Sequence, residues 1–213
     1  MTRGRFITFE GGEGAGKSTQ LRLLAERLRG RGEVVVTREP GGSPGAEAIR
    51  ALLVEGAAER WSPISETLLM YAARRDHIER VIAPALARGA WVVCDRFYDS
   101  SRAYQGAAGG APASLLQALE AEVVGADLVP DLTLILDLPA ETGLERARAR
   151  GEAEGRFEAK GLEFHRRLRT AFLDIAAAEP ERCRVIDAHA SVEAVAERIG
   201  AALASRWSEA VDG

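Results

Sequence analysis

Short apolar runs alternate with longer amphipathic stretches along the chain. The apolar runs have the length of β-strands, and each is followed by at least one stretch with the 3.6-residue periodicity of a helix. The five predicted strands are residues 6–10, 34–37, 91–95, 132–137 and 184–187. This alternation of strand and helix predicts an α/β fold with a five-stranded sheet.

The predicted strands are apolar at consecutive positions, which is typical of strands buried on both faces. We therefore expect a parallel sheet between two layers of helices, with ligands bound where the strands end. No repeat and no linker-like stretch interrupts the 213 residues, of which 46% are hydrophobic. We expect one domain over residues 1–213, with candidate binding loops at 38–45, 105–112 and 150–161, which are rich in Gly, Pro or charge.

Charge and cysteine content limit the kinds of binding partner and the cellular compartment that we expect. A net charge of −4 offers no basic footprint for a nucleic-acid polymer, so we expect a small nucleotide at most. Cys94 and Cys183 lack the spacing of metal ligands and are read as core residues in a reducing cytoplasm. No apolar stretch approaches the ~20 residues of a membrane span, and we expect no membrane association.

Residues 11–18 match the phosphate-binding pattern G-x-x-x-x-G-K-[ST], directly after the first predicted strand and before a predicted helix. In such a loop the backbone N–H groups surround phosphate oxygens, Lys17 adds a positive charge, and the Ser18 hydroxyl faces Mg²⁺. The alternative is a Gly-rich turn with a solvated lysine. The predicted ATP-binding residues are Gly11, Gly12, Glu13, Gly14, Ala15, Gly16, Lys17, Ser18 and Thr19.

The third predicted strand ends in Asp95, followed by Arg96. A carboxylate at this place in a P-loop protein lies beside the metal, so Asp95 and Ser18 are the candidate Mg²⁺ residues. Arg96 would enter the same crevice, where a guanidinium suits a phosphate. An Asp-Arg pair with a purely structural role is the alternative.

The chain has neither the Asn-Lys-x-Asp motif nor the Asp-x-x-Gly switch of GTPases, which favours a kinase acting on small molecules. Such a kinase needs a second pocket opposite ATP. Three arginine-containing segments could form it, at residues 37–42, 47–50 and 71–77. The number of arginines favours an acceptor substrate that carries negative charge.

The motifs together resemble one family. Residues 9–19, 37–42, 94–97 and 99–106, in this order, are similar to the motifs of bacterial thymidylate kinases, and the last two are the more specific. The resemblance implies a homodimeric P-loop NTPase fold, three-layered α/β/α with strand order 2-3-1-4-5. It also implies phosphoryl transfer from MgATP to dTMP, giving dTDP for dTTP synthesis.

The resemblance assigns roles to the acceptor side. Glu13 would lie near the sugar 3′-hydroxyl, Arg74 would reach a thymine carbonyl, and Tyr104 would exclude a 2′-hydroxyl. Where the family stacks a Phe on the base, this chain has Met70 with Tyr71 beside it, so either could make the contact. The predicted dTMP residues are Glu13, Arg38, Arg50, Met70, Tyr71, Arg74, Arg96, Ser100, Ser101, Tyr104 and Gln105.

Residues 146–161 resemble a lid over ATP. Family members with an arginine inside the P-loop do not need lid arginines, but here that position is Gly14, so the charge is expected from the lid. The predicted catalytic residues are Lys17, Arg96, Arg148, Arg150 and Arg156, with Arg156 favoured among the lid arginines. The alternative is a solvated basic helix end, offset by neighbouring glutamates.

Two further readings stay open at this point. The chain could phosphorylate a deoxynucleoside or another monophosphate, or it could be a regulatory module that binds ATP without turnover. The histidines have no metal-binding spacing, and His77 and His165 are predicted to lie on helix faces.

Overall fold

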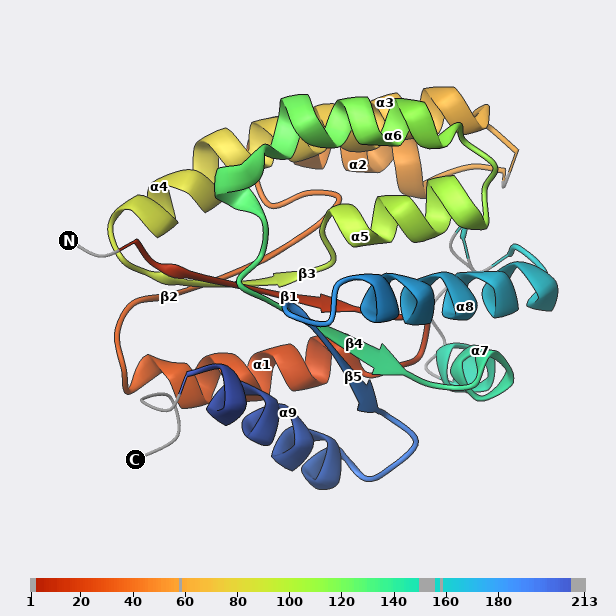
Figure 1. The fold of residues 1–213 in the computed structure, drawn as a ribbon. Helices are drawn as coiled ribbons and strands as arrows, with labels where there is room; N and C mark the ends of the chain where they lie inside the picture. Colours follow the sequence, from red (N-terminus) through yellow and green to blue (C-terminus); the bar gives the residue numbers. More distant parts are fainter. Residues whose placement is uncertain (1–2, 58, 150–155, 158, 208–213) are drawn as a thin grey trace.

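Five parallel strands form one sheet in the order β2-β3-β1-β4-β5, which confirms the expected topology. The computed structural model describes residues 3–57, 59–149, 156–157 and 159–207. The strands are β1 (Arg5–Glu10), β2 (Val34–Arg38), β3 (Trp91–Asp95), β4 (Leu132–Asp137) and β5 (Cys183–Asp187), each within one residue of its predicted bounds (Figure 1).

Helices cover both faces of the sheet, as expected (Figure 1). One face carries α1 (Lys17–Arg29) and α9 (Val192–Arg206). The rest cover the other face and the β4–β5 side. They are α2 (Pro44–Val54), α3 (Pro63–His77), α4 (Ala83–Ala87), α5 (Tyr98–Ser101), α6 (Ala113–Leu119), α7 (Ala140–Ala149) and α8 (Leu162–Ala178).

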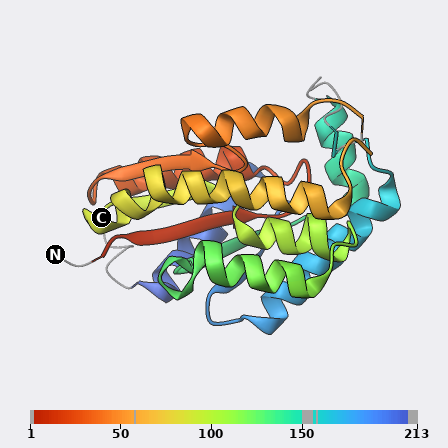
Figure 2. The same cartoon turned by 90° about the horizontal axis from the view of Figure 1, so that it is seen from above.

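Several helices continue into segments of different winding. The π-helical segments are η1 (Ile78–Ile82), η2 (Arg102–Ala107) and η3 (Glu120–Val124), and η4 (Ala126–Leu128) is a short 3-10 turn. Seen from above, α3 lies between α2 and the α5–α6 region (Figure 2). Because η2 runs to Ala107, Gln105 belongs to a helix, and the predicted loop at 105–112 begins only after Ala107.

The core follows from the period-two arrangement of side chains along the strands. Ile7 and Phe9 of β1 pack against α1 and α9, whereas Phe6 points to the opposite face, against η1 and α4. All three side chains are fully buried. This explains why the strands are apolar at consecutive positions.

The parallel register brings the carboxyl ends of the strands to one edge. There the phosphate loop follows β1, Arg38 ends β2 and Asp95 ends β3. In the described part of the chain, no helix is both long and apolar enough to cross a membrane.

Candidate active site

A cleft of about 350 Å³ opens at this edge of the sheet. The phosphate loop, the β2–α2 loop, α3 and the segment after β3 supply its walls. The predicted site residues that line it are Glu13, Gly14, Ala15, Gly16, Lys17, Ser18, Thr19, Arg38, Arg50, Met70, Arg74, Asp95, Arg96, Ser100, Ser101, Tyr104 and Gln105. Residues far apart in sequence thus converge on one hollow.

The phosphate loop depends on glycine at two positions in particular. Gly14 has φ +68°, and a Cβ there would lie 2.1 Å from the carbonyl oxygen of Gly143 in α7. Gly16, with φ 86°, is the N-cap of α1, whose first turn contains no acidic residue. The positive end of the α1 dipole therefore faces the loop without a competing carboxylate.

Lys17 curls back over the loop, where its Nζ donates to the carbonyl oxygens of Gly12 at 2.9 Å and Gly11 at 3.2 Å. Its side chain is buried, and burial is the main cause that lowers the pKa of Lys17. A phosphate arriving in the loop offers the ammonium group a negative partner.

The two candidate Mg²⁺ residues contact each other, with Ser18 Oγ donating to Asp95 Oδ2 at 3.0 Å. The other carboxylate oxygen, Asp95 Oδ1, is buried and has no hydrogen-bond partner within the described residues. A buried carboxylate oxygen without a donor is costly unless something else satisfies it. One hydroxyl and one carboxylate oxygen are the hard donors that Mg²⁺ takes in phosphate sites, so these residues fit that ion.

Arg96 has an unusual backbone, with φ 68° in the left-handed region. A non-glycine residue pays for this conformation, and such strain is concentrated at functional sites. Its guanidinium donates to the Gly11 carbonyl at 3.0 Å and to Ser100 Oγ at 3.2 Å. It also pairs with Glu13 Oε1 at 3.0 Å. Arg96 therefore lies across the phosphate loop.

Glu13 joins this arginine to a tyrosine. Tyr104 donates its hydroxyl to the same Glu13 Oε1 at 2.7 Å, and the Arg96 guanidinium lies 4.8 Å from the centre of the Tyr104 ring. Burial opposes ionisation of Glu13, but Arg96, Lys17 and the Tyr104 hydroxyl outweigh it and lower the pKa of Glu13 to about 2. Glu13 is therefore a carboxylate at neutral pH.

Two arginines enter the cleft from the β2–α2 region. Arg38 is half-exposed and pairs with Glu47 at 3.1 Å. Arg50 donates to the Pro40 carbonyl at 2.6 Å, and its partial burial is the main cause that lowers its pKa. Arg74 is deeply buried on the α3 wall. Arginines from three elements thus converge opposite the phosphate loop, together with Arg96.

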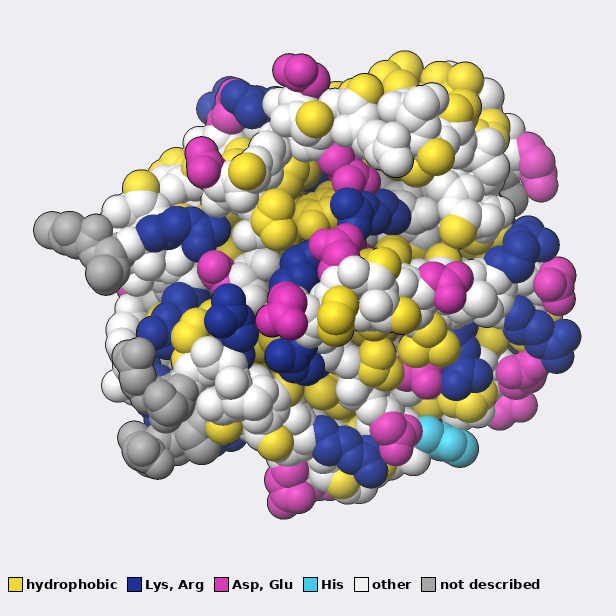
Figure 3. Space-filling view, viewed as in Figure 1, with side chains coloured by type: hydrophobic (Ala, Val, Ile, Leu, Met, Phe, Trp, Pro, Cys, Tyr) yellow, Lys and Arg dark blue, Asp and Glu magenta, His cyan; other side chains and the backbone are white. Residues whose placement is uncertain are grey.

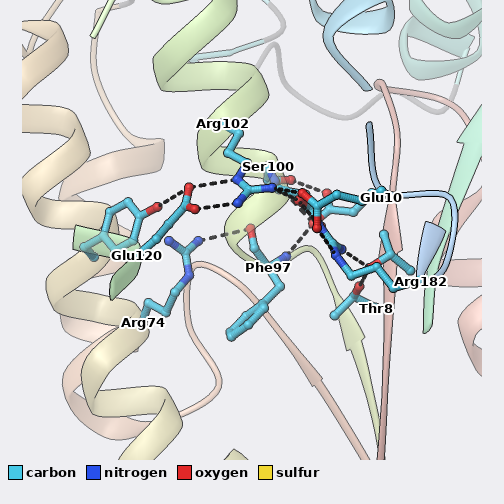
Figure 4. Close-up of polar contacts among 12 residues, drawn as sticks. Thr8, Glu10, Arg74, Phe97, Ser100, Arg102, Glu120 and Arg182 are labelled. Atoms are coloured by element: carbon cyan, nitrogen blue, oxygen red, sulfur yellow. Dashed lines mark hydrogen bonds and ion pairs between the residues drawn. The ribbon is translucent and has the colours of Figure 1, made fainter. Parts of the chain in front are cut away.

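The segment that carries the serines and Tyr104 is clamped from both sides (Figure 4). Glu10 accepts hydrogen bonds from Ser100 Oγ at 2.6 Å and from the Phe97 amide at 2.8 Å. On the other side, Asp99 accepts two from Arg182, at 2.7 and 2.8 Å. Asp99 and Glu10 are fully buried, so α5 is fixed relative to β1 and β5.

Met70 and Tyr71 point in different directions. Met70 lines the cleft, but Tyr71 does not. The Tyr71 ring lies 4.6 Å below the Arg74 guanidinium, and its hydroxyl donates to Glu120 at 3.4 Å. In this structure, only Met70 of the two faces the space where a base could lie.

The two predicted lid arginines that the structure describes, Arg148 and Arg156, do not line the cleft. Arg148 is exposed on α7, and Arg150 lies outside the described residues. The buried Arg156 pairs with Glu66 of α3 at 2.5 Å and donates to the carbonyls of Leu53 and Ala57. Arg156 thus contacts α3 and the end of α2, and not the phosphate loop, so its role toward the transferred phosphoryl group stays a prediction.

Several residues of this site were not predicted from the sequence. Phe157 lines the cleft, with its ring centre 5.5 Å from that of Tyr104. Glu10, Glu39 and Glu66 are buried carboxylates that hold site residues. Their only available signal was an acidic residue at the end of an apolar strand or on an apolar helix face, where a charge needs a partner.

Three comparisons with known proteins agree with this geometry. The family model described as thymidylate kinase matches residues 9–199. The thymidylate kinase of Caulobacter vibrioides is 69% identical over 207 residues, covering 97% of this chain and 99% of that protein. That of Rhodopseudomonas palustris is 59% identical, covering 96% and 90%. The crystal structure of thymidylate kinase from Ehrlichia chaffeensis superposes with a TM-score of 0.78 at 36% identity, covering 94% and 99%.

Proposed function

Because the chain belongs to the thymidylate kinase family, we infer that it phosphorylates dTMP to dTDP with ATP as the donor. The observation that carries this assignment to the residues is the convergence of Arg38, Arg50, Arg74 and Arg96 opposite the phosphate loop. Two anionic substrates that repel each other need positive charge between and around them.

The donor is held by the loop between β1 and α1. Its backbone N–H groups, Lys17 and the positive end of α1 bind the phosphates of ATP. Ser18 and Asp95 are the residues that would hold Mg²⁺, which would supply positive charge to neutralise the donor phosphates.

The acceptor is held by the remaining walls. Arg38, Arg50 and Arg96 surround its phosphate, while Arg74 donates to the pyrimidine from the α3 wall. The sugar lies near Glu13 and Tyr104, which are hydrogen-bonded to each other, and Tyr104 would exclude a 2′-hydroxyl. Met70 contacts the base.

The transfer itself needs positioning and charge, and no covalent intermediate. The acceptor phosphate is already an anion, so it attacks in line without a strong general base. Arg96 touches both the phosphate loop and the acceptor wall, so its guanidinium lies where negative charge grows during transfer. Arg148, Arg150 and Arg156 remain candidates for charge delivered from the lid.

Three properties of the whole protein belong to the same proposal. We infer a single domain over residues 1–213 and a cytoplasmic enzyme, which fits two buried free thiols, Cys94 and Cys183.

We also infer a homodimer. Ile64 and Leu68 lie one turn apart on α3 and are each 48% exposed, and hydrophobic side chains gather over this end of α3 in Figure 3.

The test is ADP production with ATP in the presence and absence of acceptors. We expect rapid ADP release with dTMP, and much less with UMP or thymidine. Release that does not depend on any acceptor would favour the regulatory module, and a stronger response to thymidine or UMP would favour another nucleotide kinase.

The Arg96→Ala variant tests the role assigned to Arg96 in the same assay. We expect turnover with dTMP to fall by ~10²–10³-fold, while ATP binding changes far less, because the guanidinium acts on the developing charge. Arg88→Ala, which removes an exposed arginine paired with Glu33, is the matched control. Unchanged turnover in Arg96→Ala would contradict the role given to this residue.

A further inference from the structure

A line of polar side chains with a buried centre runs from β2 to the acceptor wall of the cleft. Thr37 Oγ1 lies 2.6 Å from His77 Nε2, and His77 Nδ1 lies 3.0 Å from Glu39 Oε1. The other oxygen of Glu39 accepts from Arg74 Nε at 2.7 Å. The side chains of His77, Glu39 and Arg74 are 0%, 4% and 2% exposed, so water does not compete for these contacts.

The Glu39 carboxylate sets the direction of the hydrogen bonds that it makes with His77 and Arg74. A carboxylate only accepts, so His77 Nδ1 carries the proton that faces Glu39. In the neutral imidazole, Nε2 is then an acceptor, and the Thr37 hydroxyl donates to it. With a neutral imidazole, Thr37 therefore donates to His77 and His77 donates to Glu39, which also accepts a hydrogen bond from Arg74.

The hydrogen bonds of Arg74 leave two of its N–H groups unused. A guanidinium has five N–H donors, and Arg74 uses one on each nitrogen. Nε binds Glu39, one terminal nitrogen binds Ser101 Oγ at 3.1 Å, and the other binds the Phe97 carbonyl at 3.1 Å, as Figure 4 shows for Phe97. Each terminal nitrogen keeps one further N–H group without a partner among the described residues, and Arg74 lines the cleft.

We propose that Glu39 and His77 are positioning residues that hold the Arg74 guanidinium in one orientation, so that its free N–H groups select an acceptor base with a carbonyl oxygen at position 4. This rests on the proposed dTMP site. Thymine has an acceptor oxygen at that position, whereas cytosine has an amino group that donates. An arginine fixed in place rejects the amino group, but one free to rotate away tolerates it.

The same imidazole also supports the loop after β2. A Cβ at Gly42 would lie 2.4 Å from His77 Nε2 and 2.5 Å from Thr37 Oγ1, so the loop backbone packs directly on this pair. Loss of His77 could therefore shift the loop that carries Arg38. A shifted phosphate site weakens dTMP and dCMP equally, whereas a loosened Arg74 changes the ratio between them, so the ratio separates the two effects.

The experiment measures kcat and KM for dTMP and dCMP at saturating ATP in three variants. For His77→Leu and for Glu39→Gln we expect the KM for dTMP to rise about tenfold, the loss of a hydrogen bond to a charged group, with kcat within about twofold. The preference for dTMP over dCMP should fall by a similar factor. His77→Asn should stay closer to the wild type, because its amide N–H can replace Nδ1–H.

Two further variants separate the possible failures. Ile82→Ala removes a fully buried side chain of η1 that packs in the core, so it lowers stability without touching the cleft. If Ile82→Ala changes the dTMP to dCMP ratio as much as His77→Leu does, the effect is one of stability and the positioning role is wrong. If Arg74→Ala leaves the KM for dTMP unchanged, the proposed base site itself fails.

The positioning role is also wrong if Arg74→Ala raises the KM for dTMP while both Glu39→Gln and His77→Leu behave as the wild type. Thermal melting of every variant is measured alongside. If His77→Leu does not fold, Glu39→Gln decides, because its amide must place a donor against either Arg74 Nε or His77 Nδ1.

Discussion

Burial changes the pKa of single side chains near this cleft. Glu10 ends β1 inside the protein, where burial is the main cause that raises its pKa to about 7 from the ordinary value of 4.5. Asp99 adds to the rise, while Arg96 and the donors from Ser100 and Phe97 oppose it. Glu10 is therefore a proton-binding group that changes its charge in the physiological range.

The raised pKa of Glu10 makes part of the free energy of unfolding depend on pH. The folded state holds a proton on Glu10 that the unfolded state has already lost, so this contribution is fully present below about pH 4.5 and disappears as the pH rises through about 7. Glu10→Gln imitates the protonated form. We expect the variant to gain stability relative to the wild type between pH 5 and 8, by on the order of 3 kcal/mol.

Urea unfolding of both proteins at several pH values measures this difference. Glu197→Gln, at a position on α9 away from the cleft, is the control and should show no such trend. A difference between Glu10→Gln and the wild type that stays constant from pH 5 to 8 would show that Glu10 titrates normally.

At the scale of elements, the phosphate loop and α7 touch through two glycines. A Cβ on Gly143 would lie 2.4 Å from the Glu13 carbonyl oxygen, and a Cβ on Gly14 would lie 2.1 Å from the Gly143 carbonyl oxygen. The helix that leads toward the proposed lid is therefore packed directly on the donor site.

The Gly143→Ala variant tests the contact between α7 and the phosphate loop. Alanine favours a helix over glycine, so α7 itself should form as well as before. The added Cβ must instead displace the phosphate loop, and we expect the KM for ATP to rise about tenfold or more, with a smaller change for dTMP. Gly30→Ala, where nothing lies within 4 Å of the new Cβ, should leave both values unchanged in the same kinetic assay.

The elements themselves were predictable from local pattern, because β-branched and apolar runs mark strands wherever helices cover both faces. All five strands were found to within one residue, and the family resemblance gave their order. The π-helical turn at η2 could not be found this way. The Gly-rich sequence after Gln105 favours a loop, whereas in the structure this turn is helical and packs against α8 and α3.

The site was predictable where a motif fixes it, and not where burial does. The phosphate loop, Asp95 and Arg96 stand at strand ends and are recognised by spacing. Glu39 and His77 lie far from each other in sequence, and only the packing of α3 on the β2–α2 loop brings them together. His77 was predicted to lie on a helix face, which is confirmed, but its partners were out of reach.

At the scale of the whole molecule, the exposed face of α3 is where a second copy is proposed to pack. We expect the double variant Ile64→Asp with Leu68→Asp to be a monomer by light scattering, while the wild type is a dimer. Both side chains are half-exposed, so the fold should tolerate the change. Val185→Asp and Val192→Asp, at exposed positions on β5 and α9, are the controls and should remain dimeric. A wild type that is itself monomeric would contradict the proposed homodimer.

Several arginines of the cleft already have acidic partners before any nucleotide arrives. Arg38 pairs with Glu47, Arg74 with Glu39 and Arg96 with Glu13. A substrate phosphate therefore competes with internal carboxylates. Dissolved ions weaken the attraction for the incoming anion and the exposed Arg38–Glu47 contact at the same time. Ionic strength consequently shifts nucleotide affinity less in this protein than in a cleft of unpaired cations.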